Sequence, residues 1–396
     1  MKIAFTSSIL LLTLVIRAQT PILESWIINQ SSTTGYNGIL SNVLSVSSNN
    51  QFVYVSANSI PAYTIGPWTA NPNSPSAQNF IFKLTRTPEA SAQPVATGLG
   101  HIGVWKNGVS IFNAKDAFSY NNQGVWNQNA IIVEGISFDE CLGHPAPNGE
   151  YHTHLNPVCL YDFTNILNHA PILGYAFDGF PIYGAYAFAN PDGSGSIIRM
   201  RSSYQLRDIT TRTTLADGTL LAANQYGPAV SIQYPLGYYL EDFEYVDGLG
   251  DLDEHNGRFC ITPEYPEGIY CYFATLNEEF EASYPYVLGP RYYGVVTAGN
   301  TGPQGGHNVI PGDAVVYTPT SINENESSKF IGIITSNENW IFKDLMPHSY
   351  EVYNSSGQRL LIGKSSEINN SNLANGMYFI SVKEEDGKLQ TTKVVR

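Results

Sequence analysis

The 396-residue sequence has little charge, and what it has is mostly negative. Charged residues make up only 14% of the chain, with 20 Lys and Arg against 34 Asp and Glu, which gives a net charge of −14. No basic stripe is present, so a nucleic-acid backbone is excluded as a partner. The acidic balance is typical of a secreted surface and is also compatible with cation binding.

Several catalytic signatures are also missing. The sequence holds no G-x-S-x-G elbow, no glycine-rich phosphate loop, no H-E-x-x-H pair and no dinucleotide fingerprint. The corresponding hydrolases, nucleotide-binding enzymes and metalloproteases are therefore set aside as function classes.

Long apolar runs are missing after the N-terminus. At the N-terminus, Lys2 supplies a positive charge, Ile9–Ile16 form an apolar core, and Ala18 is a small residue before a cleavage site at Gln19. This pattern predicts a secretory signal peptide over residues 1–18, which is too short to span a bilayer. No later stretch reaches the roughly 20 apolar residues that a transmembrane helix needs.

Cysteine is scarce: the chain has four, all beyond the signal peptide. In an oxidising compartment an even number predicts two disulfides, and four cysteines allow three pairings. We favour local pairing, which closes two short rings and contributes about 2–4 kcal/mol for each. A four-cysteine zinc site is the competing interpretation, although the usual C-x-x-C spacing is absent. The favoured pairs are Cys141 with Cys159 and Cys260 with Cys271.

Tyrosine, glycine and proline are abundant instead, with 26, 35 and 23 residues. Runs such as "QFVYVSA", "NFIFKLT", "AIIVEGISF" and "GIYCYFATL" resemble β-strands between tight turns, so we predict a mostly β fold. The chain divides into a large Tyr- and Gly-rich β domain over residues 23–294, a linker over 295–326 and a small Ig-like β-sandwich over 327–396.

The last segment resembles a known family. "YNSSGQRLL", "INNSNLANGMYFISVK" and the terminal "TTKVVR" are similar to the C-terminal sorting domain of the type IX secretion system. The resemblance implies that this machinery is a partner, that the protein is exported to the cell surface or secreted, and that the tail is an address. His348 in the tail and His307 in the linker are therefore not considered as site residues.

The stretch "GEYHTHLNP" carries two histidines one residue apart, His152 and His154. On a strand they share a face, because successive side chains alternate. Three further candidates lie nearby: His144 in "CLGHP", His169 in "NHAP" and Asp178 in "AFDGF". Imidazoles suit a divalent transition metal such as Zn or Cu, and Asp178 would ligate it or orient an imidazole. The competing interpretation is a structural cluster that binds nothing.

This stretch also resembles a family. "DECLGHP", "GEYHTHLNPVC" and "HAPILGYAFDGFPIYG" look like the YHYH domain of secreted proteins, and the similarity covers most of residues 45–295. The tandem histidines of that motif correspond to His152 and His154 and its first tyrosine to Tyr151, while Thr153 replaces the second tyrosine. The replacement falls on the opposite strand face, so it leaves the paired imidazoles in place.

A second cluster, "DGLGDLDEHNGRF", combines carboxylates with glycine turns that suit Ca²⁺. Asp251, Asp253 and Glu254 are the candidate calcium ligands. Their spacing does not match an EF-hand loop, and His255 would join the histidine site if the loop folds over it. A solvated acidic turn is the competing interpretation.

Two functions are compatible with these observations. The first is a secreted or cell-surface metal-binding protein, which acts as an enzyme on an extracellular substrate if the ion keeps an open coordination position. The second is a non-catalytic adhesion module that binds a glycan or a protein through aromatic side chains. The candidates for that surface are Trp68, Trp105, Trp126, Tyr120 and the run "YPYVLGPRYYG".

Overall fold

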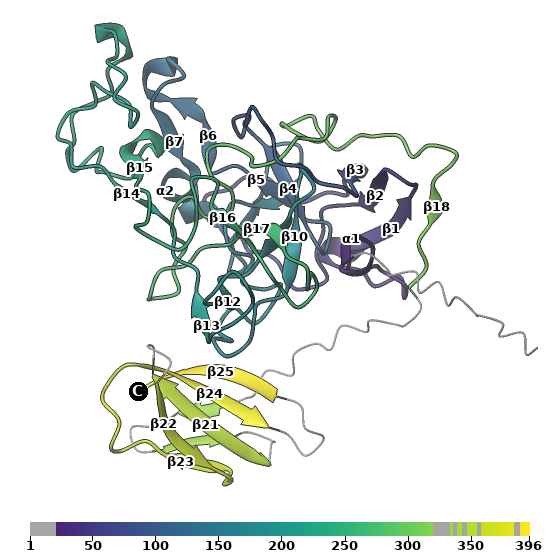
Figure 1. The fold of residues 1–396 in the computed structure, drawn as a ribbon, viewed down its shortest axis with the longest axis vertical. Coiled ribbons are helices and arrows are strands. Elements are labelled where there is room, and N and C mark those ends of the chain that lie inside the picture. The colour runs from purple at the N-terminus through teal and green to yellow at the C-terminus, as the bar shows by residue number, and fades with distance from the viewer. Residues whose placement is uncertain (1–20, 320–332, 336–338, 343–346, 355–357, 384–388) are drawn as a thin grey trace, which may run out of the picture.

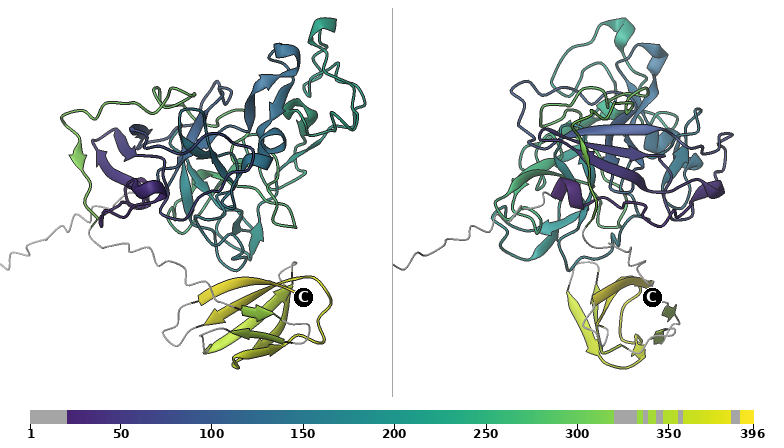
Figure 2. Two further views of the ribbon diagram at one scale, coloured as in Figure 1. Left: turned by 180° about the vertical axis from the view of Figure 1, so that it is seen from behind. Right: turned by 90° about the vertical axis from the view of Figure 1, so that its right-hand side faces the viewer.

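The structure is a computed structural model that describes residues 21–319, 333–335, 339–342, 347–354, 358–383 and 389–396. Figures 1 and 2 show a large body of short strands and long loops, and a smaller body built from the C-terminal strands. The mostly β prediction is confirmed. The predicted signal peptide lies outside the described residues.

The large body contains single-turn helices and strands of two to six residues. Its helical elements are α1 (Pro21–Glu24), η1 (Tyr36–Gly38), η2 (Tyr120–Asn122), α2 (Ala130–Val133), η3 (Gly135–Ser137), η4 (Ala223–Gln225) and η5 (Leu240–Asp242). Its strands are β1 (Val43–Ser48), β2 (Phe52–Ala57), β3 (Phe80–Thr85), β4 (His101–Trp105), β5 (Ser110–Phe112), β6 (Lys115–Ser119), β7 (Asn127–Asn129), β8 (Gly143–Pro145), β9 (Tyr151–Thr153), β10 (Ile172–Ala176), β11 (Pro181–Tyr183), β12 (Tyr186–Phe188), β13 (Ile197–Arg199), β14 (Tyr204–Leu206), β15 (Phe243–Tyr245), β16 (Gly257–Cys260), β17 (Ile269–Phe273) and β18 (Val315–Val316).

An eight-stranded mixed sheet forms the centre of the large body, in the order β16-β17-β11-β10-β4-β5-β9-β8. The pairs β5/β9 and β11/β17 are parallel and the other neighbours are antiparallel. A four-stranded antiparallel sheet has the order β18-β1-β2-β3. The β8–β9 hairpin therefore stands at one edge of the central sheet, where its side chains can face a cavity.

The burial pattern of the strands follows their sequences. In β3 the side chains Phe80, Phe82 and Leu84 are buried and those between them are half-buried, as expected for a strand with one core face. Strand β4 is buried along its whole length, which is typical of a strand covered on both faces. One hydrophobic core joins these strands to the rest of the large body.

The run "AIIVEGISF" differs from its predicted strand structure. It forms α2 and η3 instead, because the Asn129 side chain accepts a hydrogen bond from the backbone N–H of Ile131 and caps the helix. The two turns lie beside β8 and place Glu134 and Ser137 close to the predicted histidine site.

Residues 297–317 differ from the linker that their composition predicts. The side-chain amide of Asn300 accepts from the backbone N–H of Lys83 at 2.9 Å and donates to its carbonyl at 2.6 Å. Farther on, β18 pairs with β1, and the backbone N–H of Tyr317 donates to Val46 at 2.8 Å. The segment is thus part of the large body.

The tail forms two sheets, of order β19-β20-β23 and β22-β21-β24-β25. Its described strands are β19 (Ile333–Thr335), β20 (Asn339–Phe342), β21 (Ser349–Asn354), β22 (Arg359–Gly363), β23 (Glu367–Asn369), β24 (Met377–Lys383) and β25 (Leu389–Val395). Buried side chains including Trp340, Val352 and Ile380 give the tail its own core. Phe379 also packs against Phe280 of the large body, with ring centroids 4.9 Å apart.

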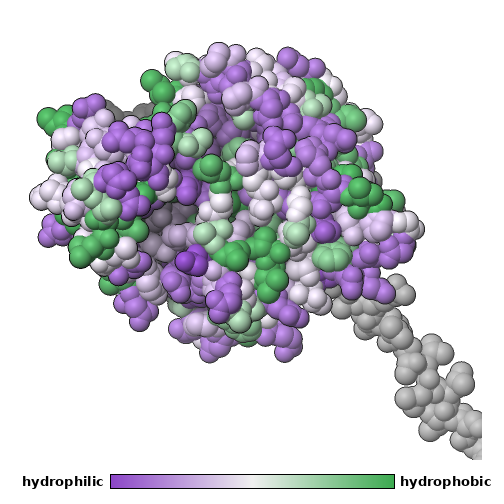
Figure 3. Space-filling view, turned by 90° about the horizontal axis from the view of Figure 1, so that it is seen from above, coloured by the Kyte–Doolittle hydropathy of each residue, from purple (hydrophilic) through white to green (hydrophobic). Residues whose placement is uncertain are grey.

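The described part of the chain was found to contain no membrane-spanning helix. No helix in that part of the chain is long and apolar enough to cross a bilayer. Figure 3 looks down on the end of the large body that is uppermost in Figure 1, where hydrophobic residues form small patches separated by hydrophilic ones and the surface is hollowed.

Candidate metal centre

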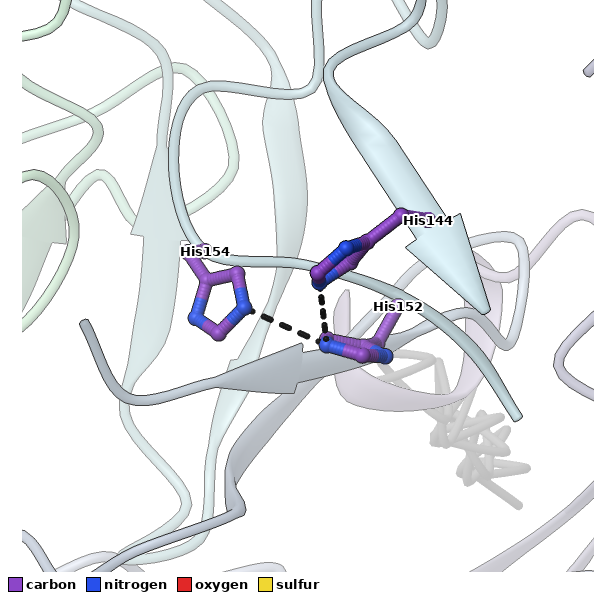
Figure 4. Close-up of side chains that lie close together, drawn as sticks. All are labelled: His144, His152 and His154. Atoms are coloured by element: carbon purple, nitrogen blue, oxygen red, sulfur yellow. Dashed lines mark hydrogen bonds between the residues drawn. The ribbon is translucent and has the colours of Figure 1, made fainter. Parts of the chain in front are cut away.

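The β8–β9 hairpin brings three histidines together. Strand pairing sets His144 directly opposite His152, and His154 follows two residues later on the same chain segment. The Nε2 atom of His152 lies 3.0 Å from that of His144 and 3.2 Å from that of His154. Figure 4 shows the three rings converging from the two strands. All three residues are buried, with 3–5% of their surface exposed.

The hairpin turn is fixed by local sequence. The backbone N–H of Ala146 donates to Glu150, and that of Gly149 donates back to Ala146, both at 2.8 Å. Gly149 adopts a φ of +81°, and a Cβ there would lie 2.2 Å from the Ser76 hydroxyl. Only glycine fits this position without a shift of its surroundings. The Asn-Gly pair thereby sets the register that places the histidines opposite each other.

The other ring nitrogen of each histidine is held by the protein. The Nδ1 atom of His152 lies 3.1 Å from the carbonyl oxygen of Glu150, and that of His154 lies 2.8 Å from the carbonyl oxygen of Asn113. Because a carbonyl oxygen only accepts, both Nδ1 atoms carry the proton. In the neutral ring of His152 the Nε2 atom is therefore a lone-pair acceptor.

The same holds for His144, through a hydroxyl. Its Nδ1 atom lies 2.7 Å from the Ser137 hydroxyl oxygen. That hydroxyl donates its own proton to the carbonyl oxygen of Glu134 at 2.7 Å, so it accepts from His144. The Nε2 lone pairs of His144 and His152 thus face each other, with His154 Nε2 3.2 Å from that of His152. Three ring nitrogens gathered in this way are the arrangement of imidazoles that share one ion.

Burial keeps the rings of His144 and His152 neutral. Burial first, and the charge of His154 second, lower the pKa of His144 to about 4. Burial, followed by the nearby histidines, also lowers the pKa of His152 well below its usual value. Neutral imidazole is the form that ligates metals, so these two rings are ready to bind at neutral pH.

A carboxylate missed by the sequence prediction lies beside the histidines. The Glu134 Oε2 atom is 3.2 Å from His154 Nε2 and 3.6 Å from His144 Nε2. Partial burial raises the pKa of Glu134, but its hydrogen bond to His154 and the charges of both histidines outweigh this effect and lower it. The carboxylate is therefore ionised at neutral pH and places a negative charge beside the histidines.

Aromatic rings and a second buried pair complete the surroundings. Phe112 stacks on His152, with ring centroids 3.9 Å apart and planes 24° from parallel. His101 Nε2 lies 2.6 Å from Glu150 Oε1, and both side chains are buried. The histidines and Glu134 line a cavity of about 610 Å³, so the site is accessible to a small molecule or a side chain.

Two predicted ligands do not join this group. His169 donates from Nδ1 to the carbonyl oxygen of Ala170 at 2.8 Å and packs against Tyr183. Asp178 accepts from the Tyr272 hydroxyl at 2.5 Å and from the backbone N–H of Gly294 at 2.8 Å. Each side chain is engaged in its own part of the core, so neither joins the three histidines in this structure. Among the described residues, the group of side chains placed to hold a metal is His144, His152 and His154.

The predicted calcium cluster is not assembled either. Asp251 pairs with the Arg201 guanidinium at 2.9 Å, and Asp253 accepts from the Tyr270 hydroxyl at 2.9 Å. Glu254 is exposed and lies 3.9 Å from His255, whose Nδ1 atom donates to the carbonyl oxygen of Arg291. The carboxylates point to separate partners, so this loop is a hydrogen-bonded turn.

One of the two predicted disulfides is present. Cys141 and Cys159 are bonded, with Cα atoms 5.2 Å apart, and the ring that they close contains the three histidines. Cys260 and Cys271 are instead separate buried thiols. The antiparallel register sets Cys260 opposite Ile269, so the two cysteines are offset diagonally on β16 and β17. The second predicted disulfide is not formed in this structure and stays a prediction.

The aromatic surface expected for an adhesion module is only partly formed. Trp105 and Trp126 are buried and donate hydrogen bonds to Thr153 and to the carbonyl oxygen of Gln225. Thr153, which replaces the second tyrosine of the motif, faces Trp105 on the side away from the histidines. Tyr284 of the "YPYVLGPRYYG" run does line a cavity.

Comparison with known proteins agrees with both resemblances. A family model described as YHYH protein matches residues 81–285, just over half of the chain, and one described as secretion system C-terminal sorting domain matches residues 329–396. No curated protein and no solved structure matches the chain. The fold, the tail and the histidine site define an exported β protein of the cell surface or the medium, handled by type IX secretion. The chain belongs to the YHYH protein family.

Proposed function

We propose that the protein is a metal-dependent enzyme that holds one zinc or copper ion with His144, His152 and His154. The orientation of the three rings supports this most directly. The facing acceptors of His144 and His152, 3.0 Å apart, repel each other unless a cation lies between them, and His154 Nε2 stands 3.2 Å from that of His152. Nitrogens about 2.0–2.1 Å from a tetrahedral zinc ion are separated by about 3.4 Å, which is close to these spacings.

The donor set and its surroundings favour catalysis over a structural role. Three histidines leave one position of a tetrahedral ion open, and the group lines a cavity. The ion would supply Lewis-acid chemistry, such as polarising a carbonyl group or activating water. Glu134 stands next to His154 and lines the same cavity, so its carboxylate would accept the proton released in hydrolysis.

The alternative, an adhesion module with a structural histidine cluster, has less support. Two of its candidate tryptophans, Trp105 and Trp126, are buried. A structural cluster also gives no reason for the Nδ1 atoms of His144 and His152 both to donate outward, since a hydrogen bond between these two rings needs a proton on one of the facing nitrogens.

Metal content tests the proposal. The secreted protein, purified without chelator or histidine tag, should carry about one zinc or copper ion per chain by plasma mass spectrometry. His152→Ala should lose it, and the matched control His169→Ala should keep it, because His169 is a partly buried histidine outside the group. Retention of the ion at the wild-type level by His144→Ala, His152→Ala and His154→Ala would overturn the assignment.

Cobalt substitution separates an enzyme from a structural site without a known substrate. If the ion has an open position, azide added to the cobalt-loaded protein should change its visible absorption. A spectrum that is unaffected by azide indicates a closed, structural ion. Glu134→Gln should retain cobalt, because it leaves the three imidazoles in place.

A further inference from the structure

A second cavity lies next to the histidine cavity. Its volume is about 540 Å³, and its walls come from segments far apart in the sequence. They include Tyr204 of β14, Phe243 and Tyr245 of β15, and Tyr284 of the loop after β17. The proposed catalytic chemistry makes no use of this cavity.

The aromatic rings of this cavity form a corner. Tyr284 stacks on Phe243, with centroids 4.0 Å apart and planes 9° from parallel. Tyr204 stands almost perpendicular to Tyr284, at 82°, and Tyr245 is turned 60° from Tyr204. A sugar ring needs one flat aromatic platform, whereas rings at steep angles surround a cation with their negative faces.

The charged groups of the cavity have the matching sign. Asp217, Glu241 and Glu244 line it, against the single ammonium group of Lys115. Glu241 is held from one side, by the side chain and backbone N–H of Asn127. Burial raises the pKa of Glu241 to about 7, so a bound cation would favour its ionised form.

The two cavities share a wall. Asn113 and Lys115 line both of them. The carbonyl oxygen of Asn113 holds His154, while its side-chain amide donates to the carbonyl oxygens of Thr97 and Gly98. One extended ligand can therefore reach both cavities across a segment that is rigidly connected to the histidine centre.

We propose that the aromatic cavity binds the cationic side chain of a basic peptide, a lysine or an arginine, and presents that peptide to the histidine centre. Aromatic faces at steep angles and an excess of carboxylates are the features that recognise organic cations. The first half of this statement concerns binding alone. The second half rests on the proposed metal-dependent function.

Binding is tested with small probes on the secreted protein after removal of metal by dialysis against chelator. We expect Nα-acetyl-arginine amide to bind at least about tenfold more tightly than Nα-acetyl-citrulline amide, its neutral analogue of the same shape, by isothermal titration calorimetry at low salt. Equal affinity for the two probes, or no binding of either, overturns the proposal. Binding of a neutral oligosaccharide without binding of the arginine probe would assign the cavity to sugars and would also overturn the proposal.

Variants locate the binding in the cavity. Glu244→Gln and Tyr245→Leu should each weaken the arginine probe about three- to tenfold, because one removes a carboxylate and the other a ring face. The control Glu278→Gln removes a carboxylate that is 83% exposed outside the cavity, and should leave the affinity unchanged. Equal losses in Glu244→Gln and Glu278→Gln would reveal a general charge effect and contradict the assignment. Tyr245→Phe, which keeps the ring, should bind normally and guards against loss of folding.

The test separates the two proposals. Arginine binding by a protein that never retains zinc or copper upholds the cation cavity and rejects the metal centre. Metal retention with equal affinity for the arginine and citrulline probes upholds the metal centre and rejects the cation cavity.

Discussion

The histidine hairpin and the acidic loop contain the same kinds of ligand atoms but use them differently. In the acidic loop two of the three candidate carboxylates have a donor of their own: Arg201 for Asp251, and the Tyr270 hydroxyl for Asp253. In the hairpin, backbone and hydroxyl groups hold the Nδ1 atoms, and the three Nε2 atoms face each other with the Glu134 carboxylate beside them. A ligand site is marked by acceptors that converge without donors, whereas composition alone does not distinguish the two regions.

This difference has an energetic side. The carboxylates of the acidic loop are satisfied within the fold, so they contribute to stability. The histidine group is buried with like atoms in contact, which costs stability until a cation binds. Substitutions in the hairpin should therefore affect metal binding most, and substitutions in the loop should affect the free energy of unfolding most.

One substitution in each region should separate metal binding from stability. His152→Leu should abolish metal retention, yet leave the metal-free protein as stable as wild type or more so, because it removes the facing acceptors. Asp253→Ala should keep the metal and lower the free energy of unfolding by about 2–4 kcal/mol, since Tyr270 and the backbone N–H groups of His255 and Gly257 lose their acceptor. Metal content and urea unfolding give both values. A metal-free His152→Leu protein that is strongly destabilised would identify the histidines as structural.

Acid should affect the two regions in different pH ranges. The pKa of His144 is about 4 in the fold, lowered first by burial, against about 6.5 in the unfolded chain. Between these values the unfolded chain binds a proton that the fold does not, so the metal-free protein loses stability as the pH falls from about 6.5 to 4. The expected loss is on the order of 2–3 kcal/mol.

The acidic loop should respond at lower pH. Burial raises the pKa of Asp251, but the hydrogen bond and charge of Arg201 outweigh it and lower the pKa below 3.8. The stability from this group is present above 3.8 and is lost only below it. Unfolding curves for His144→Phe should therefore be flatter between pH ~6.5 and ~4, while those for Asp251→Asn should follow wild type there. The reverse pattern would contradict the assignment of the neutral histidine.

A smaller effect is expected from the hydroxyls that support each region. Ser137→Ala removes the acceptor for His144 Nδ1 and should weaken metal binding about tenfold, as loss of a supporting partner does in other metal sites. Ser203→Ala removes the hydroxyl that donates to Leu252 and accepts from Gly250 in the acidic loop. It should reduce stability and leave metal affinity unchanged. Equal metal affinity in the two variants would show that Ser137 does not orient the ring.

Much of the centre follows from local sequence. Alternation along a strand predicts that His152 and His154 share a face, and the Asn-Gly turn with the Cys141–Cys159 ring keeps His144 close to both. Local patterns also predict the mostly β fold and the strands β2, β3 and β17. These features depend on neighbours within a few residues, which is the range that a sequence pattern records.

The remaining features depend on contacts between distant segments. The acceptor for His154 is Asn113, 41 residues away, and it is brought close by the parallel pairing of β5 with β9. Glu134 lies in a run that reads as a strand but is capped into a helix. For Asp178 the sequence gives proximity to the motif but not the partner that engages it elsewhere, Tyr272. Spacing along the chain records none of these contacts.

The smallest expected effect concerns the ion pair of the acidic loop. The Arg201 side chain is 55% exposed, so solvent screens its bond to Asp251 and the pair should contribute about 0.5 kcal/mol. Asp251→Asn should lower the melting temperature by only a degree or two, and added CaCl₂ should not shift the melting temperature of wild type. A calcium-dependent rise that disappears in Asp251→Asn would make the loop a cation site after all. It would also show that a carboxylate already paired with arginine can exchange that partner for an ion.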